Sequence, residues 1–294
     1  MKPAKFDYLR PSSLPQALEM LAGSNGEVKI LAGGQSLVPM MNFRVARPEK
    51  LIDINRLPDL DYIRIEDDKL VIGALARHAS IHASPVARAA SPLMCEAYQW
   101  VAHHPIRTRG TLCGNLCHAD PASEMPAVMI ASEAELIVAG AAGRRTIAAA
   151  DFFIGIYETA IQPDEILLEA RIPVAAANQR FGFLETSMRR GDFAMCCAVA
   201  LLTINGGIVE NSAVVVAGIF DRATRLTAVE QAINGRRPND IVLTDIGGIA
   251  ASALPIYGDQ RVSAEYKTDL IDAHVSRAIA QALEHSVSDM GGQS

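Results

Sequence analysis

Residues 28–37 read Val-Lys-Ile-Leu-Ala-Gly-Gly-Gln-Ser-Leu, an apolar run followed by two glycines, an amide and a hydroxyl. The run from Val28 to Leu31 predicts a strand, and the glycines predict a tight turn in which a ligand can lie against the backbone. Successive N–H groups in such a turn form a concave anion site that suits a phosphate. The side chains of Gln35 and Ser36 add hydrogen-bonding groups. On its own, the pattern is more typical of an ordinary turn than of a binding site.

A second glycine-rich stretch follows about eighty residues later. Residues 107–121 read Arg-Thr-Arg-Gly-Thr-Leu-Cys-Gly-Asn-Leu-Cys-His-Ala-Asp-Pro, which again combine glycines with a hydroxyl and an amide. Two phosphate-binding loops separated by a subdomain would suit a dinucleotide whose pyrophosphate is held from both sides. The pair of loops therefore predicts a dinucleotide site, which neither loop predicts alone.

These two motifs, Ala-Gly-Gly-Gln-Ser at residues 32–36 and Gly-Thr-Leu-Cys-Gly-Asn at residues 110–115, resemble the FAD-binding medium subunit of the molybdenum hydroxylases. That family includes carbon monoxide, quinoline and nicotine dehydrogenases and, as a fused domain, xanthine dehydrogenase. The resemblance covers nearly the whole chain, from Phe6 to the C-terminal helix. It implies FAD as the cofactor of this chain.

The expected fold class is α+β. A two-lobed FAD-binding domain of the PCMH type, with two α/β subdomains, precedes a small C-terminal domain in which a three-stranded antiparallel sheet packs on helices. The strands of that sheet are predicted from the apolar runs at 181–186, 198–204 and 213–219, and a long helix from 269–285. The predicted boundaries are 1–57 for the first subdomain, 58–175 for the second, 176–288 for the C-terminal domain and 289–294 for a flexible tail.

The resemblance also implies which residues bind FAD. The first loop and the strand before it supply one set of contacts, and the second loop and the segment after it supply another. The implied residues are Lys29, Leu31, Ala32, Gly33, Gly34, Gln35, Ser36, Leu37, Thr111, Gly114, Asn115, Ala119 and Asp120.

Three further positions match family contacts but also have an ordinary structural explanation. Glu124 occupies the position of an acid that faces the cofactor, yet it equally fits a carboxylate at a helix N-terminus. Leu167 matches a position whose backbone touches the flavin and is compatible with a strand core residue. Phe193 lies in a segment that resembles the one reaching the flavin ring, and a core phenylalanine is an equal alternative.

Two residues depart from the family pattern. Cys113 stands where the family usually has glycine, so its side chain must point away from the phosphates or the loop must shift. Glu185 stands where the fused eukaryotic relatives carry a lysine near the flavin, which puts an NAD-reducing arrangement in doubt. The five cysteines have no metal-binding spacing and are expected to be reduced thiols in a cytoplasmic protein.

The bulk properties exclude several classes of function. The net charge of −6 argues against nucleic-acid binding. The longest apolar run, 194–204, is too short for a transmembrane helix, and no signal peptide is expected. His78 and His82 have the i, i+4 spacing of metal ligands, but a third ligand is missing, so a surface or capping role is preferred and no metal site is predicted.

The resemblance implies an electron-transfer role. Electrons pass from a large molybdenum-cofactor subunit through two [2Fe–2S] clusters of a small subunit to the FAD of this chain and then to an external acceptor, in a dimer of heterotrimers. No residue of this chain is expected to act as a general acid or base. Two alternatives stay open: a free-standing flavin oxidase or dehydrogenase, and a flavin-free scaffold subunit, which only Cys113 supports. The substrate (carbon monoxide, an N-heteroaromatic compound, a purine or an aldehyde) and the acceptor also stay open.

Overall fold

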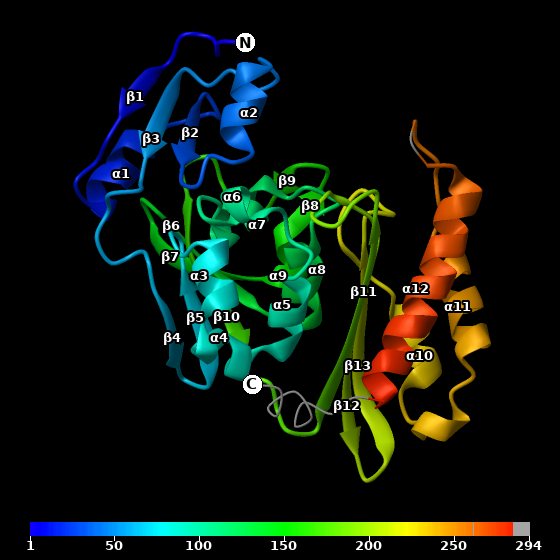
Figure 1. The fold of residues 1–294 in the computed structure, drawn as a ribbon. Helices are drawn as coiled ribbons and strands as arrows, with labels where there is room; N and C mark the ends of the chain where they lie inside the picture. Colours follow the sequence, from blue (N-terminus) through cyan, green and yellow to red (C-terminus); the bar gives the residue numbers. More distant parts are fainter. Residues whose placement is uncertain (261, 285–294) are drawn as a thin grey trace.

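The computed structural model describes residues 1–260 and 262–284, which form three lobes, each built on its own sheet (Figure 1). The first lobe is at the N-terminus, the second contains the largest sheet, and the third carries the long C-terminal helix. The predicted tail, residues 289–294, lies outside the described residues, as do the last residues of the predicted C-terminal domain. The domain boundaries at 57 and 175 stay predictions.

The first lobe is a parallel sheet with strand order β1-β3-β2. Its helix α1 begins where Ser13 accepts a hydrogen bond from the Gln16 N–H at 3.3 Å, and its buried face carries Ala17 and Leu21. The strand β1 was not predicted, because three residues are too short to show an alternating pattern. Its elements are β1 (Asp7–Leu9), α1 (Leu14–Leu21), β2 (Val28–Leu31), α2 (Leu37–Asn42) and β3 (Lys50–Asp53).

The second lobe has a five-stranded antiparallel sheet with strand order β4-β5-β10-β6-β7. Strands β4 and β5 form a hairpin that turns at Asp67 and Asp68, and both turn residues have positive φ. The strands, with the separate β8–β9 hairpin, are β4 (Ile63–Glu66), β5 (Lys69–Gly73), β6 (Glu135–Gly140), β7 (Gly143–Ala148), β8 (Phe153–Gly155), β9 (Glu158–Thr159) and β10 (Ile166–Pro173).

The helices of the second lobe are short because prolines and serines interrupt them. The chain from Pro85 to Ala97 forms two helices that are separated at Ser91 and Pro92, and Ser84 caps the first of them by accepting from the Ala87 N–H at 3.2 Å. The helices are α3 (His78–Ala83), α4 (Pro85–Ala90), α5 (Pro92–Ala97), α6 (His104–Arg107), α7 (Leu112–His118), α8 (Glu124–Ala131) and α9 (Ala149–Phe152).

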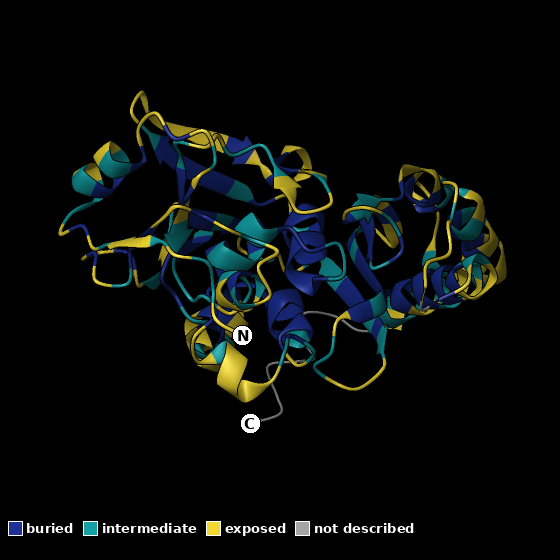
Figure 2. Cartoon of the chain, turned by 90° about the horizontal axis from the view of Figure 1, so that it is seen from above, coloured by how far each residue is buried: buried dark blue, intermediate teal, exposed yellow. Residues whose placement is uncertain are grey.

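Helix α8 joins the second lobe to the third. Its residues are apolar on all sides apart from Glu124, and every one of them is buried, as expected of a helix enclosed by other elements. It packs against α5 and α7 on one side and against strands of the third lobe on the other. Figure 2 shows the buried residues concentrated in the sheets and the central helices.

The third lobe is an antiparallel sheet with strand order β11-β12-β13-β14, and α12 packs on β11 and β12. The prediction of three strands needs correction, because a two-residue strand, Thr224–Arg225, adds a fourth at the edge. The elements are β11 (Gln179–Ser187), β12 (Ala194–Asn205), β13 (Ile208–Ala217), β14 (Thr224–Arg225), α10 (Thr227–Ile233), the 3₁₀ turn η1 (Pro238–Asp240), α11 (Leu243–Ser252) and α12 (Ala264–Glu284). In the described part of the chain, no helix is long and apolar enough to cross a membrane.

Candidate functional site

The two glycine loops lie in direct contact. The first loop leaves β2 through Gly33 and Gly34, and Gly34 has a φ of +69° that favours glycine. A Cβ atom on Gly33 would lie 2.5 Å from the backbone oxygen of Arg109 and 2.7 Å from the Cα of Gly110. Only glycine at position 33 therefore allows the backbones of the two loops to approach this closely.

A polar bridge holds the loops in this position. The guanidinium of Arg77 donates to the backbone oxygen of Arg109 and, at 2.6 Å, to Oδ1 of Asn55. The Asn55 amide in turn donates to the backbone oxygen of Ala32 at 2.8 Å. Burial lowers the pKa of Arg77, but an arginine stays charged, so the bridge consists of strong charge-assisted bonds.

The second loop leads into α7, and its hydroxyl and amide are used locally. Thr111 caps the helix by accepting from the Gly114 N–H at 3.1 Å, and a Cβ on Gly114 would lie 2.7 Å from that hydroxyl oxygen. The Asn115 amide donates to the hydroxyl of Ser123 at 2.8 Å. The first loop differs: Ser36 precedes α2 but its side chain makes no capping bond there.

A cavity of about 1370 Å³ opens between the three lobes and is lined by both loops. Drug-sized ligands occupy pockets of roughly 300–1,000 Å³, so this cavity is large enough for an extended dinucleotide. The second lobe contributes α7 and β10, and the third lobe contributes the start of β12 and of α12. No group of three or more potential metal ligands occurs among the described residues.

The structure brings most of the sequence-predicted residues together at this cavity. Those that line it are Lys29, Leu31, Ala32, Gly33, Gly34, Gln35, Ser36, Leu37, Thr111, Gly114, Asn115, Glu124, Leu167 and Phe193.

Ala119 and Asp120 are not among the residues that line the cavity, and their contact with FAD stays a prediction. Ala119 adopts the left-handed conformation at the end of α7 (φ 50°, ψ 44°). The Asp120 carboxylate accepts from the Ala122 N–H at 2.9 Å and from the Tyr157 hydroxyl at 3.2 Å. Asp120 therefore stabilises the loop behind the cavity wall.

The position of Glu124 is compatible with both explanations, and its contact with the cofactor stays a prediction. It is the first residue of α8, where the helix dipole favours a negative charge, and it also lines the cavity. The pKa of the Glu124 carboxyl is raised to about 7, chiefly by burial and in smaller part by the negative charge of Asp120. A hydrogen bond from its own backbone N–H acts in the opposite direction. Near neutral pH this carboxyl can therefore hold or release a proton.

Leu167 and Phe193 line the same cavity from different environments. Leu167 is buried in β10, beside a β-bulge between β10 and β6. Phe193 precedes β12 and is 59% exposed, so it is not a core residue. An exposed ring at the wall of a cavity can cover a planar ligand.

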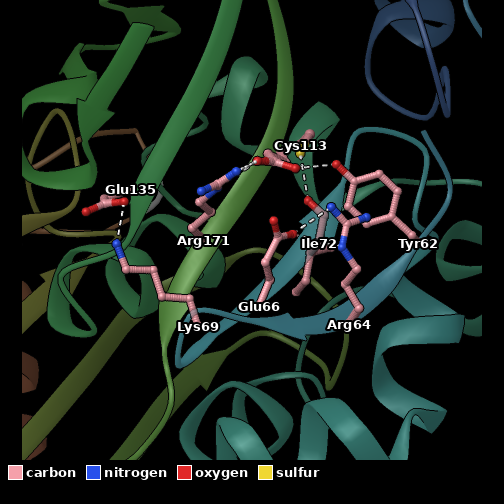
Figure 3. Close-up of polar contacts among 9 residues, drawn as sticks. Tyr62, Arg64, Glu66, Lys69, Ile72, Cys113, Glu135 and Arg171 are labelled. Atoms are coloured by element: carbon pink, nitrogen blue, oxygen red, sulfur yellow. Dashed lines mark hydrogen bonds and ion pairs between the residues drawn. The ribbon is translucent and has the colours of Figure 1, made fainter. Parts of the chain in front are cut away.

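The side chain of Cys113 points into the core of the second lobe. Its thiol lies 4.0 Å from the backbone oxygen of Ile72, next to the ion pairs on the surface of the sheet (Figure 3). Burial raises its pKa well above the usual range, so the thiol is inert. The loop therefore accepts the cysteine with its side chain buried, although Cys113 still belongs to the cavity wall.

The histidine His78 is buried, so the predicted surface role is wrong for this residue. Its Nδ1 lies 3.2 Å from the Tyr98 hydroxyl, and its ring lies beneath Gly110, where a Cβ would be 2.9 Å from its Cδ2. Burial lowers its pKa to about 4, so it is neutral at physiological pH. It contributes to the wall of the cavity as an uncharged ring.

Sequence reasoning missed the residues that act through contacts between lobes. Arg77 and Asn55 lie outside both glycine motifs. Lys267 lines the cavity from α12, is 7% exposed and pairs with Asp259 at 2.8 Å. The sequence around Lys267 gives no signal for this role, because it reads as an ordinary amphipathic helix.

Comparison with known proteins agrees with this architecture. Residues 4–175 match the FAD-binding domain in molybdopterin dehydrogenase, and residues 183–282 match the C-terminal domain of the CO dehydrogenase flavoprotein. The chain is 40% identical to caffeine dehydrogenase subunit beta of Pseudomonas sp. (strain CBB1), over 98% of each chain.

Two solved structures have the same fold over nearly the full chain. A carbon monoxide dehydrogenase from Hydrogenophaga pseudoflava that lacks the Mo-pyranopterin moiety of its cofactor superposes with a TM-score of 0.93 at 35% identity, covering 97% of this chain and 99% of that one. Quinoline 2-oxidoreductase from Pseudomonas putida 86 gives 0.90 at 30% identity with the same coverage. Two adjoining family matches and the shared fold show that the chain belongs to the FAD-binding medium subunits of the molybdenum hydroxylases.

Proposed function

We propose that this chain is the electron-transfer flavoprotein of a molybdenum hydroxylase, which takes electrons from [2Fe–2S] clusters of a partner subunit and passes them to an external acceptor. As a member of the family, it is an oxidoreductase subunit with an FAD-binding domain. The observation that carries the proposal is the cavity between the lobes, because both glycine loops line it.

The residues present fit FAD. The contact of Gly33 with the second loop leaves the backbone of both loops bare of side chains, as a pyrophosphate requires. The hydroxyl of Ser36 makes no capping bond and is available to a phosphate oxygen. The apolar wall formed by Leu167 and Phe193 suits the face of a planar ring.

Within this proposal, the chain binds and orients its cofactor. The first loop and Ser36 hold the pyrophosphate, and the second loop, with Gly114 and Asn115, closes over it. Phe193 covers one side of the ring and limits access to it. The flavin itself supplies the redox chemistry when bound, and no side chain of this protein needs to act as a general acid or base on a substrate.

The partners follow from the names of the relatives. Medium chains of carbon monoxide dehydrogenase imply large and small subunits in the same complex. We propose that the large subunit carries the molybdenum cofactor, that the small one carries two [2Fe–2S] clusters, and that the complex is a dimer of heterotrimers. A location in the cytoplasm stays a prediction that rests on the five free cysteines.

An absorption spectrum of the purified chain, recorded before and after denaturation, tests the proposal. Flavin bands and about one equivalent of released FAD per chain are expected. A chain that contains no flavin and takes up none, alone or with its partner subunits, would contradict the proposal and favour the flavin-free scaffold. Turnover of a substrate by the chain without partners would favour a free-standing oxidase or dehydrogenase.

A further inference from the structure

Glu185 is a buried carboxyl with little to compensate a negative charge: the nearby Ser187 hydroxyl favours its charged form only weakly against burial. It lies on β11 opposite Cys197 of β12 and is 7% exposed. Within the described part of the chain, neither of its carboxyl oxygens has a hydrogen-bond partner. A buried ionised carboxylate without partners is strongly unfavourable, so such a group binds a proton instead.

Glu124 and Glu185 both lie at the junction of the second and third lobes, where α8 packs against β12, the strand that pairs with β11. Two backbone hydrogen bonds join the segment before Glu124 to the third lobe: Ala194 N–H to Ala122 O at 3.2 Å, and Gly218 N–H to Pro121 O at 2.8 Å. Both carboxyls raise the pKa of the Cys197 thiol, and Cys197 lies opposite Glu185 in the sheet. Glu124 lines the cavity, whereas Glu185 does not.

The charges around the pair do not offset its negative charge. Burial and then the charge of Glu124 raise the pKa of Glu185 to about 8, against a lowering by the nearby Ser187 hydroxyl. The charge of Asp120 also raises the pKa of Glu124, and the thiols of Cys196 and Cys197 and the hydroxyl of Tyr98 nearby are uncharged because their own pKa values are raised.

Three basic side chains lie on the neighbouring helix α12. Burial lowers the pKa of His274, which contacts the Thr186 hydroxyl at 2.9 Å. The ammonium of Lys267 is paired with Asp259, and Arg277 is exposed to solvent, which screens its charge. Two buried carboxyls in these surroundings are therefore favoured to bind a proton.

We propose that Glu124 and Glu185 form a proton-binding carboxyl pair, and that FAD binding draws protons from solution onto this pair. FAD would remove water from Glu124 and bring two negatively charged phosphates into the cavity. Both effects favour the uncharged form of a nearby carboxyl. The step involves no redox change: each proton comes from solvent and binds a carboxylate oxygen. The inference rests on the proposed function, because it takes FAD as the occupant of the cavity.

The sign of the expected pH dependence follows from linkage. If the complex holds more protons than the apoprotein, FAD affinity falls as pH rises through the pKa values of the apoprotein. One proton taken up corresponds to about a tenfold loss of affinity per pH unit at most. For wild type, we expect affinity to fall about tenfold between about pH 7 and about pH 9.

The experiment measures FAD affinity from the quenching of flavin fluorescence in the full-length apoprotein across this pH range. Glu185→Gln keeps the shape of the side chain but cannot ionise, so its affinity should change at least threefold less over the same interval. Glu49→Gln removes an exposed carboxylate outside the cavity and is the matched control, with the wild-type slope expected. A flat wild-type profile, or a Glu185→Gln profile as steep as wild type, would overturn the inference.

Infrared spectroscopy of the apoprotein gives a readout that needs no flavin. A protonated carboxyl has a C=O band distinct from that of a carboxylate, and this band should be present at neutral pH and reduced in Glu185→Gln. Its absence in wild type would overturn the inference even if FAD binds. A chain that binds no FAD at any pH would instead contradict the proposed function, and with it the role of the pair in cofactor binding.

Discussion

At the scale of the residue, Gly33 decides whether the two loops can meet. We predict that Gly33→Ala weakens FAD binding at least about tenfold, or about 1.4 kcal/mol. The reason is the overlap between the new Cβ and the backbone of Arg109 and Gly110, which forces the loops apart. Equilibrium titration with FAD measures the change.

A second glycine offers a matched control for this substitution. Gly248 is exposed in α11, has no positive φ, and has no atom within 4 Å of the place that a Cβ would occupy. Gly248→Ala should leave FAD affinity unchanged and stabilise the helix by about 1 kcal/mol. Equal FAD affinities for Gly33→Ala and wild type would show that the close contact of the loops is not needed.

The unpartnered carboxyl of Glu185 gives a prediction about stability. A glutamate in the unfolded chain titrates near 4.5, whereas burial raises the pKa of Glu185 to about 8 in the folded chain. Between these values the folded state holds the extra proton, so stability is greatest below the lower value and is lost as pH rises toward the upper one. Wild type should lose about 1.4 kcal/mol of unfolding free energy per pH unit relative to Glu185→Gln across this window.

Urea denaturation of both proteins at several pH values between about 5 and 9 measures this difference. The comparison with the variant cancels the contributions of other titrating groups. A constant difference in unfolding free energy across the window would mean that Glu185 titrates as an ordinary carboxyl.

At the scale of the element, the bridge from Arg77 to Asn55 connects the first lobe to the second. Arg77→Lys keeps the charge but loses the planar fork that reaches two acceptors at once. We expect both Arg77→Lys and Asn55→Ala to weaken FAD binding about five- to tenfold, and the double variant to lose less than the sum. A double-mutant cycle on FAD affinity should give a coupling of about 0.5–3 kcal/mol.

Arg88 provides the control for this cycle, because it is an exposed arginine on α4. Arg88→Ala should leave FAD affinity at the wild-type value. If the effects of the Arg77 and Asn55 substitutions simply add, the two residues act independently and do not form a bridge.

At the scale of the whole molecule, the cavity makes the cofactor a link between the lobes. All three lobes line it, so FAD should stabilise them together. Saturation at about 100 times the dissociation constant adds about 2.7 kcal/mol to the unfolding free energy. Thermal unfolding, followed by Trp100 fluorescence for the second lobe and by circular dichroism for the whole chain, should shift upward in one transition. A part of the chain that unfolds at an unchanged temperature in the presence of FAD would contradict this.

The sequence by itself determined the elements and the family. The positive φ of Gly34 is a local property of its turn, and the long strands of the third lobe follow from continuous apolar runs. These features could be predicted because the geometry of a turn and the apolar pattern of a strand depend on residues that are adjacent in sequence.

Only the tertiary structure decided which side chains meet. The pairing of Arg77 with Asn55 and the approach of Lys267 to the cavity from α12 join residues that are distant in sequence, so they depend on how the lobes sit. The edge strand β14 is likewise too short to show a pattern of its own. Burial also decided the protonation of Glu124 and Glu185, because the cost of a charge depends on the atoms around it and not on its neighbours along the chain.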